Sequence, residues 1–504
     1  MTRKILFIGL AAFITILTWW FLTTPPKGFA TLKDKSFYID GEPFHVMCIN
    51  YKITLRAANG KIWPNRFIGY EKDNEFSTSD ADSSIGEIEK DFQLAKDMGF
   101  NTIRIVGIGE PMIVGQKGKP NVYFIAYEGD NCCFDFDHND AEAWAEYQKA
   151  ISTVLDAAAK TGLKVIFTTK MLPGVPVLNT ILEEMVVAHG HRSEILAWDF
   201  LNEPLYFDSV PHTKEEVYYA TRQWNEIVKS NSHHLTTIGL ACQREVFVWD
   251  PNLVQVDFIS FHPYEYEAEQ VRSELYWYDK FVNKPWIVGE TGIPADNDSI
   301  PYSDQVAFAK KTYYQELNCR GAGYSWWQFK DVSWGGFHQS FLGVVSHDGS
   351  TKLSNGDTVA GTVKDLGKEL KTLMSNYKPE PCLCPENYYN FSSHTYYSIK
   401  GKVLDGKGNP IKGAGILAWD EPYINHHFTT TKADGTFELF SEYKFHHWMV
   451  SALDHEKGFN HLDPNTAVQL GPTLTQDLGE VTIKRVSYDP WQRFFRRFSS
   501  KRYR

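Results

Sequence analysis

The sequence predicts an α/β fold, a (β/α)8 TIM barrel, followed by a smaller all-β sandwich domain and preceded by a transmembrane helix. Three features indicate this arrangement. Eight short apolar stretches mostly alternate with stretches of helical periodicity, the pattern changes to alternation after about residue 395, and an uncharged run lies near the N-terminus. The expected barrel strands begin near residues 44, 101, 163, 195, 235, 257, 285 and 323.

The stretches between these strands support the barrel. Residues 37–50 alternate, turn at Asp40-Gly41 and continue as an apolar run, which predicts a hairpin that leads into the first strand. Residues 51–84 are polar and predict a long loop over the strand-end face. The spacing of apolar residues predicts helices at 85–98, 141–160, 177–189, 214–231, 267–282, 303–320 and 363–375. No obvious full helix separates the strands near 235 and 257.

Length and composition limit the classes of protein to consider. With 504 residues, of which 43% are hydrophobic, the chain can build a large core and a second domain. A net charge of -11 argues against nucleic acid as the main partner. The 15 Trp and 26 Tyr residues suit a protein that stacks sugar rings on aromatic faces, although the same side chains can simply fill the core.

Residues 1–27 predict a signal anchor. Arg3 and Lys4 precede an uncharged run at residues 5–22, which is just long enough to cross a bilayer as a helix at ~1.5 Å per residue. The positive charges place the N-terminus in the cytoplasm, and no good cleavage site follows the run. We therefore expect a single-pass membrane protein whose later domains are extracytoplasmic. Cleavage of a signal peptide, giving a secreted or periplasmic protein, is the alternative.

The pattern changes after the expected barrel, residues 28–377. A Pro-containing stretch at 378–395 predicts a linker, and residues 396–486 alternate and turn on Gly and Pro, which predicts a β-sandwich. Residues 408–414 read Gly-x-Pro-x-x-Gly-Ala and residues 434–437 read Asp-Gly-x-Phe. With these motifs the domain resembles the carboxypeptidase regulatory-like β-sandwich.

The tail, residues 487–504, is basic and aromatic within an acidic protein. It either lies on an anionic membrane surface or an acidic polymer, or is a solvated terminus.

Seven cysteines are scattered over the chain, at positions 48, 132, 133, 242, 319, 382 and 384. Disulfides are possible after export. Neither 132–133 nor 382–384 is interpreted as a zinc site, because two further ligands at short spacing are missing. The histidine pairs at 426–427 and 446–447 are not expected to bind metal, because adjacent residues of a strand face opposite ways.

Two carboxylates follow expected buried strands. The run from Ile195 ends in Asn202-Glu203-Pro204, and residues 285–289 lead into Glu290. In a barrel both would lie at the C-terminal face, where barrel enzymes hold their chemistry. Retaining glycoside hydrolysis needs such a pair, one carboxyl to protonate the leaving oxygen and a second, about 5 to 5.5 Å away, to attack the anomeric carbon.

Neighbouring residues suit supporting roles in that chemistry. Asn202 can hold a sugar 2-hydroxyl, and Arg104 can keep the nucleophile ionised. His262 and Tyr264 follow another strand, where Tyr264 can donate a hydrogen bond to Glu290. These side chains would complete a polar site at the strand ends.

Two tryptophans lie at the end of the eighth expected strand. Trp326 and Trp327 should face opposite ways, so one of them should be structural. The Trp-x-Phe-x-Asp pattern that begins at Trp327 favours this residue as the platform under a pyranose ring.

The motifs together resemble a known group. They are Gly99-Phe-Asn-Thr-Ile-Arg104, Trp198-Asp-Phe-Leu-Asn-Glu-Pro204, His262-Pro-Tyr264, Val288-Gly-Glu290 and the Trp327 strand. In this order they resemble clan A glycoside hydrolases, closest to glycoside hydrolase family 5, the cellulase and mannanase group, over about residues 36–375. The resemblance implies that Glu203 is the acid/base and Glu290 the nucleophile.

One feature of that family is missing. Its members usually carry a histidine at the end of strand three, whereas this chain reads Thr168-Thr169-Lys170. The floor of the −1 subsite is therefore expected to differ, which leaves the sugar open.

The sequence thus predicts a retaining hydrolase of β-glycosidic bonds in an extracytoplasmic polysaccharide or oligosaccharide. We expect a β-linked glycan as substrate, the membrane as a contact through the N-terminal helix, no nucleic acid partner, and no metal or organic cofactor. Transglycosylation by the same residues is one alternative. A catalytically silent, glycan-binding surface protein is another. The oligomeric state is open.

Overall fold

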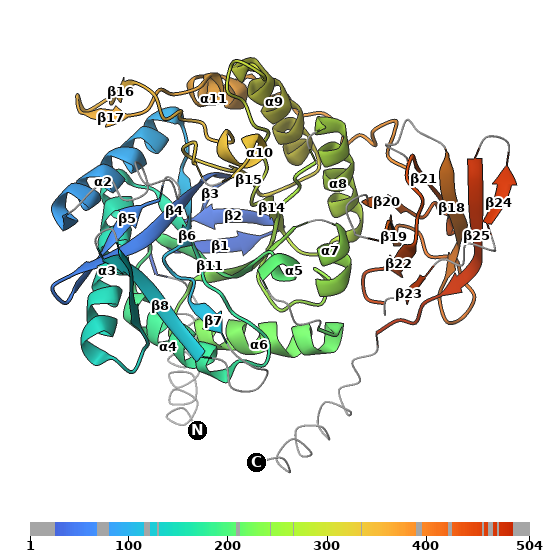
Figure 1. Ribbon diagram of the computed structural model, residues 1–504, viewed down its shortest axis with the longest axis horizontal. Helices are drawn as coiled ribbons and strands as arrows, with labels where there is room; N and C mark the ends of the chain where they lie inside the picture. The colour runs from blue at the N-terminus through green and yellow to red at the C-terminus, as the bar shows by residue number, and fades with distance from the viewer. Residues whose placement is uncertain are drawn as a thin grey trace, which may run out of the picture.

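The computed structural model describes residues 26–67, 80–114, 121–128, 131–207, 212–241, 243–265, 267–333, 335–389, 396–421, 426–455, 458–461, 467–470 and 473–486. Within these ranges the chain forms a closed barrel surrounded by helices, and an all-β part beside helices α7 and α8 (Figure 1).

Eight parallel strands form the barrel. They are β4 (Val46–Ala58), β6 (Thr102–Gly107), β10 (Lys164–Thr168), β11 (Ile195–Asn202), β12 (Leu235–Leu240), β13 (Ile259–Phe261), β14 (Trp286–Val288) and β15 (Gly323–Trp326). Parallel pairing of β15 with β4, which sets Trp326 opposite Ile49, closes the ring. The predicted TIM barrel and its eight strands are confirmed.

Helices surround the barrel. They are α2 (Ala81–Met98), α3 (Ala141–Thr161), α4 (Pro176–His189), α5 (Pro204–Phe207), α6 (Lys214–Asn231), α7 (Gln243–Trp249), α8 (Ala268–Phe281), α9 (Tyr302–Asn318), α10 (Phe337–Ser340) and α11 (Asp365–Asn376). Two four-residue helices, α5 and α10, follow the ends of barrel strands. The seven expected helices are confirmed within a few residues. The stretch between β12 and β13, which showed no clear helical pattern, holds the short α7.

Local sequence explains where several helices begin and end. Asp80 and Asp140 cap α2 and α3 by accepting the N–H groups of the first turns, and Gly99 and Gly162 end the same helices in the left-handed conformation. Thr213 caps α6 in a reciprocal capping box.

The expected long loop at residues 51–84 is wrong for its first part. β4 continues to Ala58, turns at Asn59-Gly60 with φ of 52° and 75°, and returns as β5 (Lys61–Arg66). Tyr51, Ile53 and Leu55 are buried, so the stretch alternates with period two and forms a hairpin. Residues 68–79 of the expected loop lie outside the described ranges.

Further strands extend this side of the barrel. β8 (Asn121–Glu128) pairs with β4, and β7 (Met112–Val114) and β9 (Asn131–Phe136) pair with β8. A small antiparallel pair, β16 (Ser350–Lys352) and β17 (Thr358–Ala360), lies before α11.

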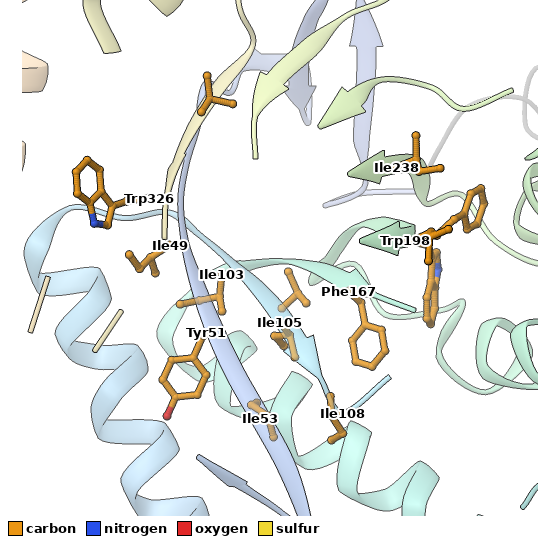
Figure 2. Packing of buried hydrophobic residues seen from close by; sticks show 14 of the residues in the cluster. Ile49, Tyr51, Ile53, Ile103, Ile105, Ile108, Phe167, Trp198, Ile238 and Trp326 are labelled. Carbon is orange, nitrogen blue, oxygen red and sulfur yellow. The ribbon is translucent and has the colours of Figure 1, made fainter. Parts of the chain in front are cut away.

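The main core lies between the barrel and its helices. Ile49, Tyr51 and Ile53 of β4 lie beside Ile103 and Ile105 of β6 in one apolar cluster (Figure 2). Burying such side chains contributes roughly 1.5–3 kcal/mol each relative to exposing them.

A second cluster closes the N-terminal end of the barrel. The sheet of β1 (Ala30–Lys33), β2 (Ser36–Ile39) and β3 (Glu42–Pro43) places Phe37 edge-on against Phe258. This leaves the opposite, C-terminal face of the barrel for a site.

The C-terminal part consists of two four-stranded sheets, ordered β21-β18-β25-β24 and β20-β19-β22-β23. Its strands are β18 (Tyr397–Leu404), β19 (Gly415–Trp419), β20 (His426–Thr430), β21 (Thr436–Ser441), β22 (His447–Ser451), β23 (Gly458–His461), β24 (Ala467–Leu470) and β25 (Thr473–Thr482). One apolar cluster includes Ile399 and Phe437 from the first sheet and Ile416 and Val450 from the second. We call this part, the described residues within 396–486, the β-module. Its relation to the carboxypeptidase regulatory-like family stays a prediction.

The predicted linker is attached to the barrel. Cys382 forms a disulfide with Cys319 at the end of α9, and Tyr388 is buried. Cys48 is a buried free thiol and Cys384 an exposed one.

Among the described helices none is long and apolar enough to cross a membrane. The predicted anchor at residues 5–22 and the basic tail at residues 487–504 lie outside the described ranges.

Candidate active site

Glu203 follows the last residue of β11 at the C-terminal face of the barrel. Its backbone has a φ of 45°, an uncommon conformation for a residue other than glycine, and its N–H donates to the carbonyl of Gly239 at 3.0 Å. Pro204 then starts the short helix α5. The side chain of Glu203 keeps 16% of its surface exposed, so it is accessible from the face of the barrel.

Glu290 lies two residues beyond β14 and is almost fully buried, with 3% of its surface exposed. Its Oε1 accepts a hydrogen bond from Arg104 Nη1, and its Oε2 accepts one from the Tyr264 hydroxyl at 2.9 Å. Both of its oxygens are therefore engaged by donors that stabilise the charged form.

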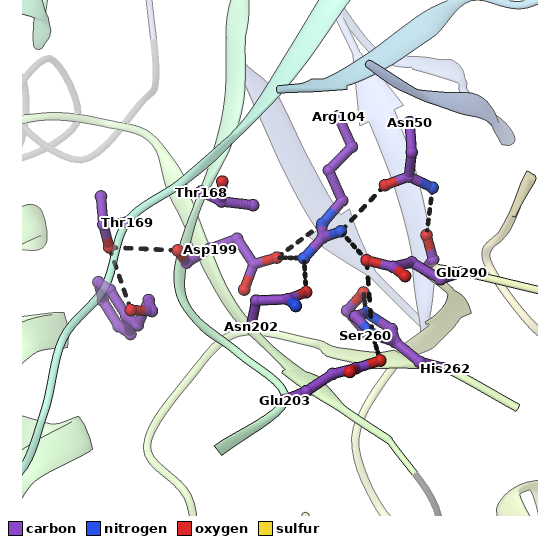
Figure 3. Close-up of polar contacts among 12 residues, drawn as sticks. Asn50, Arg104, Thr168, Thr169, Asp199, Asn202, Glu203, Ser260, His262 and Glu290 are labelled. Carbon is purple, nitrogen blue, oxygen red and sulfur yellow. Dashed lines mark hydrogen bonds and ion pairs between the residues drawn. The ribbon is translucent and has the colours of Figure 1, made fainter. Parts of the chain in front are cut away.

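Arg104 is the centre of the polar network (Figure 3). Its guanidinium is fully buried and donates to Asp199 Oδ2 at 2.8 Å, to Asn50 Oδ1 at 2.9 Å and to Asn202 Oδ1 at 2.7 Å, besides its bond to Glu290. The guanidinium of Arg104 in β6 thus connects residues of β4 and β11 with Glu290, two residues beyond β14.

Asn50 and Asp199 were not anticipated from the sequence. Asn50 donates through Nδ2 to the carbonyl of Gly289 at 3.0 Å and to Ser325 Oγ at 2.9 Å. Asp199 is a fully buried charge within β11. An ionised residue inside an otherwise apolar strand is the signal that could have identified it, because buried charges need a partner.

His262 lies between the two glutamates. Its Nδ1 is 3.1 Å from Glu203 Oε1 and 3.6 Å from Glu290 Oε1. A Cβ at Gly239 would come within 2.7 Å of the His262 ring, so the glycine at this position leaves room for the imidazole. Burial lowers the pKa of His262 to about 4, which keeps the ring neutral at physiological pH.

The two glutamates have different electrostatic surroundings. Burial raises the pKa of Glu203 to about 7, and the charge of Arg104 opposes this rise without a hydrogen bond to Glu203. Burial also raises the pKa of Glu290, but the Arg104 cation and the hydrogen bond from the Tyr264 hydroxyl act in the opposite direction. Glu203 is therefore the better holder of a proton and Glu290 the better carboxylate.

Glu203, His262 and Glu290 form one set of possible metal ligands, whose donor atoms lie within 4.8 Å of one another. It is the single group of this kind within the described ranges. The Arg104 cation already contacts Glu290 and would repel a divalent ion, so the arrangement favours acid–base chemistry over metal binding.

Trp326 and Trp327 differ as the sequence predicts. Trp326 is buried and donates its indole N–H to the carbonyl of Leu342 at 2.8 Å, so it is part of the core. Trp327 is half-buried, its backbone N–H donates to the carbonyl of Thr291 at 2.9 Å, and its peptide bond to Gln328 is cis. Its backbone thus lies beside the residue that follows Glu290.

The end of the third barrel strand carries two buried hydroxyl groups. Thr168 Oγ1 donates to the carbonyl of Ile105 at 2.7 Å and to Glu110 Oε1 at 2.9 Å. Thr169 Oγ1 donates to the carbonyl of Asp199 at 3.2 Å. Both hydroxyls hold neighbouring chain segments, and no imidazole comes from this strand.

Comparison with known proteins leaves the family open. No family model matches the chain, and no curated protein matches its sequence. Solved structures that match the chain include a GH5_18 protein from Streptomyces cattleya in complex with Manb1-4GlcNAc, at 14% identity and a TM-score of 0.44 over 67% of this chain and 84% of that one. Another is a β-glucosidase from Thermotoga maritima in complex with castanospermine, at 11% identity and a TM-score of 0.43 over 67% and 98%.

A third match is an FMN-binding β-glucuronidase from Facaelibacterium prausnitzii, at 14% identity and a TM-score of 0.46 over 86% of this chain and 58% of that one. At these identities and TM-scores the matches assign neither a family nor a substrate, so the function of the chain has to come from the geometry of its site.

Proposed function

We propose that the protein is a retaining hydrolase of β-glycosidic bonds, with Glu203 as acid/base and Glu290 as nucleophile. The observation that carries the proposal is the pair of strand-end carboxyl groups, whose nearest oxygens lie within 4.8 Å and of which only Glu290 is bonded to Arg104. Retaining enzymes hold their carboxyl groups about 5 to 5.5 Å apart, whereas inverting enzymes need about 6.5 to 9.5 Å to admit a water.

The two steps follow from these positions. Glu290 attacks the anomeric carbon while Glu203 gives its proton to the glycosidic oxygen, which leaves as an alcohol and produces a glycosyl ester on Glu290. Glu203, now ionised, takes a proton from water, and the resulting hydroxide equivalent attacks the anomeric carbon and frees Glu290. The second step returns the pair to its starting state, with the proton on Glu203 and the charge on Glu290, as its electrostatics favour.

The neighbouring residues support these steps. Arg104 and the Tyr264 hydroxyl stabilise the ionised nucleophile. Asn202, whose Oδ1 accepts from Arg104 at 2.7 Å, would hold the sugar 2-hydroxyl through its amide NH2 group, a contact that strengthens in the transition state. Neutral His262 bridges the two carboxyl groups, and Trp327 is proposed as the platform for the sugar ring.

Two alternatives remain to be tested. A transglycosylase would use the same residues and transfer the sugar to an acceptor hydroxyl instead of water. A silent glycan-binding protein would not need an acid near pKa 7 beside a carboxylate held by an arginine, so the presence of both groups argues against it.

We further propose that the enzyme works outside the cytoplasm, tethered by residues 5–22. The disulfide between Cys319 and Cys382 supports this location, because such bonds persist mainly in oxidising compartments. The substrate would be a β-linked polysaccharide or oligosaccharide met at the cell surface.

The test is rescue by azide. Glu290→Ala should lose hydrolysis of an aryl β-glycoside, and azide should restore turnover with a glycosyl azide of inverted configuration. Glu203→Ala should give an azide product of retained configuration, because its nucleophile is intact. Glu226→Ala on the exposed face of α6 is the control and should match the wild type. Full activity of Glu290→Ala, or the opposite stereochemistry, would refute the assignment.

A panel of β-linked glucans and mannans, followed by product analysis, identifies the sugar. Products longer than the substrate would favour the transglycosylase, and binding without turnover would favour the silent protein.

A further inference from the structure

A third buried carboxyl group lies beside the segment that carries Glu203. Glu245 is in the first turn of α7 and has no exposed surface. Its Oε1 accepts the backbone N–H of Leu205 at 2.5 Å, and its Oε2 accepts the backbone N–H of Ala241. One carboxylate therefore joins the turn after β11 to the end of β12.

This link bears directly on the position of Glu203. Glu203 adopts a positive φ, and Leu205 is only two residues further along the chain. The backbone N–H of Glu203 donates to the carbonyl of Gly239 in β12, and that of Leu205 donates to Glu245 in α7. The backbone around Glu203 is therefore held from both β12 and α7. A residue in an uncommon backbone conformation persists only when its surroundings hold it there.

Helix α7 is in turn held by the β-module. The hydroxyl of Ser451 in β22 donates to the carbonyl of Phe247 at 3.2 Å, and the backbone N–H of Asp454 donates to Asp250 Oδ2 at 2.7 Å. A Cβ at Gly415 in β19 would come within 1.9 Å of the Phe247 ring, so the strand lies directly against the helix.

A buried lysine strengthens the same contact. Lys214 at the start of α6 donates from Nζ to Asp250 Oδ2 at 2.8 Å and to the carbonyl of Ala452 at 2.9 Å. The β-module thus contacts both helices that flank the β11–β12 edge of the site, as its place beside α7 shows (Figure 1).

We propose that Glu245 is a positioning residue for the acid/base Glu203, and that the β-module acts in catalysis by holding α7, and with it Glu245, against the turn after β11. This inference rests on the proposed function for its kinetic consequences. It assigns the β-module a role at the site that does not depend on binding glycan.

Glu245→Gln is the first test. The amide is similar in shape but offers one acceptor oxygen, and its NH2 group faces a backbone N–H, so one of the two bonds is lost. The turn that carries Glu203 should loosen, and proton donation should suffer more than nucleophilic attack.

The kinetic readout separates these two steps by leaving group. A phenyl or alkyl β-glycoside needs a proton at its leaving oxygen, whereas a 2,4-dinitrophenyl β-glycoside does not. We expect kcat/KM of Glu245→Gln to fall about tenfold or more on the poor leaving group, since general acid catalysis contributes roughly 100-fold to 10,000-fold. On the dinitrophenyl glycoside it should stay within about twofold. Glu245→Asp should recover part of the loss.

A matched glycine pair tests the role of the β-module. Gly415→Ala pushes against Phe247 of α7, whereas Gly401→Ala in β18 makes its close contacts at Gly479 and Phe437 inside the β-module. Gly415→Ala should reproduce the leaving-group pattern of Glu245→Gln, and Gly401→Ala should not. The two glycine variants are compared under conditions in which the barrel has equal thermal stability in both.

Hydrogen exchange gives a readout that needs no activity. The backbone amides of Glu203 and of residues 205–207 should exchange faster in Glu245→Gln and Gly415→Ala than in the wild type and Gly401→Ala. Unchanged exchange, or an equal loss on both leaving groups, would overturn the positioning role. If the exchange rates differ between the variants as expected but the wild type hydrolyses no glycoside, the proposed function is refuted and the structural link between the β-module and the turn is supported.

Discussion

Replacement of Arg104 is the strongest test of how the site is held together. Arg104→Met removes the cation that contacts two buried carboxylates, Asp199 with no exposed surface and Glu290 with 3% exposed. Removing one partner of a buried ion pair typically costs about 3–5 kcal/mol. We expect a loss of that size in the free energy of unfolding. Many domains of this kind retain about 5–15 kcal/mol, so the variant should still fold.

Arg104→Lys separates charge from geometry. Lysine keeps the charge, but its single ammonium cannot reproduce the planar fork that reaches Asp199, Asn50, Asn202 and Glu290 together. Leaving one or two of these acceptors unsatisfied should cost about 1–3 kcal/mol each. This variant also provides the test if Arg104→Met does not fold.

Urea unfolding and the pH dependence of kcat/KM measure the two consequences. Without Arg104 the charged form of Glu290 loses a favourable interaction, so its pKa rises and the acid limb of the pH profile moves to higher pH. Arg222→Met, which removes an exposed i,i+4 ion pair on α6, is the control and should change stability by about 0.5 kcal/mol at most. An Arg104→Met protein within about 1 kcal/mol of the wild type, with an unmoved acid limb, would refute the reasoning.

Three further predictions follow from single contacts. Burial raises the pKa of Glu203 to about 7, and the protonated form is the proposed acid, so kcat/KM should fall as pH rises through about 7. Glu203→Gln should lose this basic limb of the pH profile. If the limb persists in the variant, another residue is the acid. Trp326→Ala should lower the free energy of unfolding in urea by about 3–5 kcal/mol, because its indole is buried. Trp327→Ala should change that free energy little and should raise KM. The reverse outcome would exchange the roles of the two tryptophans. Cys382→Ser, which removes the Cys319–Cys382 disulfide across a separation of 63 residues, should lower the free energy of unfolding in urea by about 2–4 kcal/mol. Cys384→Ser, which removes an exposed free thiol, is the control and should leave stability nearly unchanged; an equal loss in both variants would refute a stabilising role of the disulfide.

The barrel was predictable because its strands and helices carry different periods. Buried parallel strands such as β11 are apolar along their length, and helices such as α3 repeat apolar residues every three to four positions. The β4–β5 hairpin was missed because the polar residues of the stretch, among them Lys52, Thr54 and Arg56, favoured a loop, although Arg56 is itself buried. The Asn59-Gly60 dipeptide was the available signal.

Several strand-end residues of the candidate site could be proposed from the sequence, but the contacts that connect them could not. Arg104 bonds residues that are 54, 95, 98 and 186 positions away in the sequence, so no local pattern could show which carboxylate it holds. Asn50 and Asp199 become functional candidates only once the barrel brings them to the guanidinium. Glu245 was missed for a similar reason, because its partners lie on the turns after two other strands.

The difference between the two glutamates follows from backbone geometry as much as from sequence. Asn202, the last residue of β11, directs its amide oxygen to Arg104, and in a regular continuation of the strand the next side chain would face the opposite side of the sheet. The positive φ of Glu203 instead turns its side chain toward His262, which is neutral. Glu203 therefore escapes a direct bond to the cation and keeps a pKa near 7, while Glu290, delivered from another strand, receives that bond. On this reasoning any change that relaxes the backbone at Glu203 should weaken the acid before it weakens the nucleophile, which is why the leaving-group dependence is the measurement most sensitive to the structure around β11.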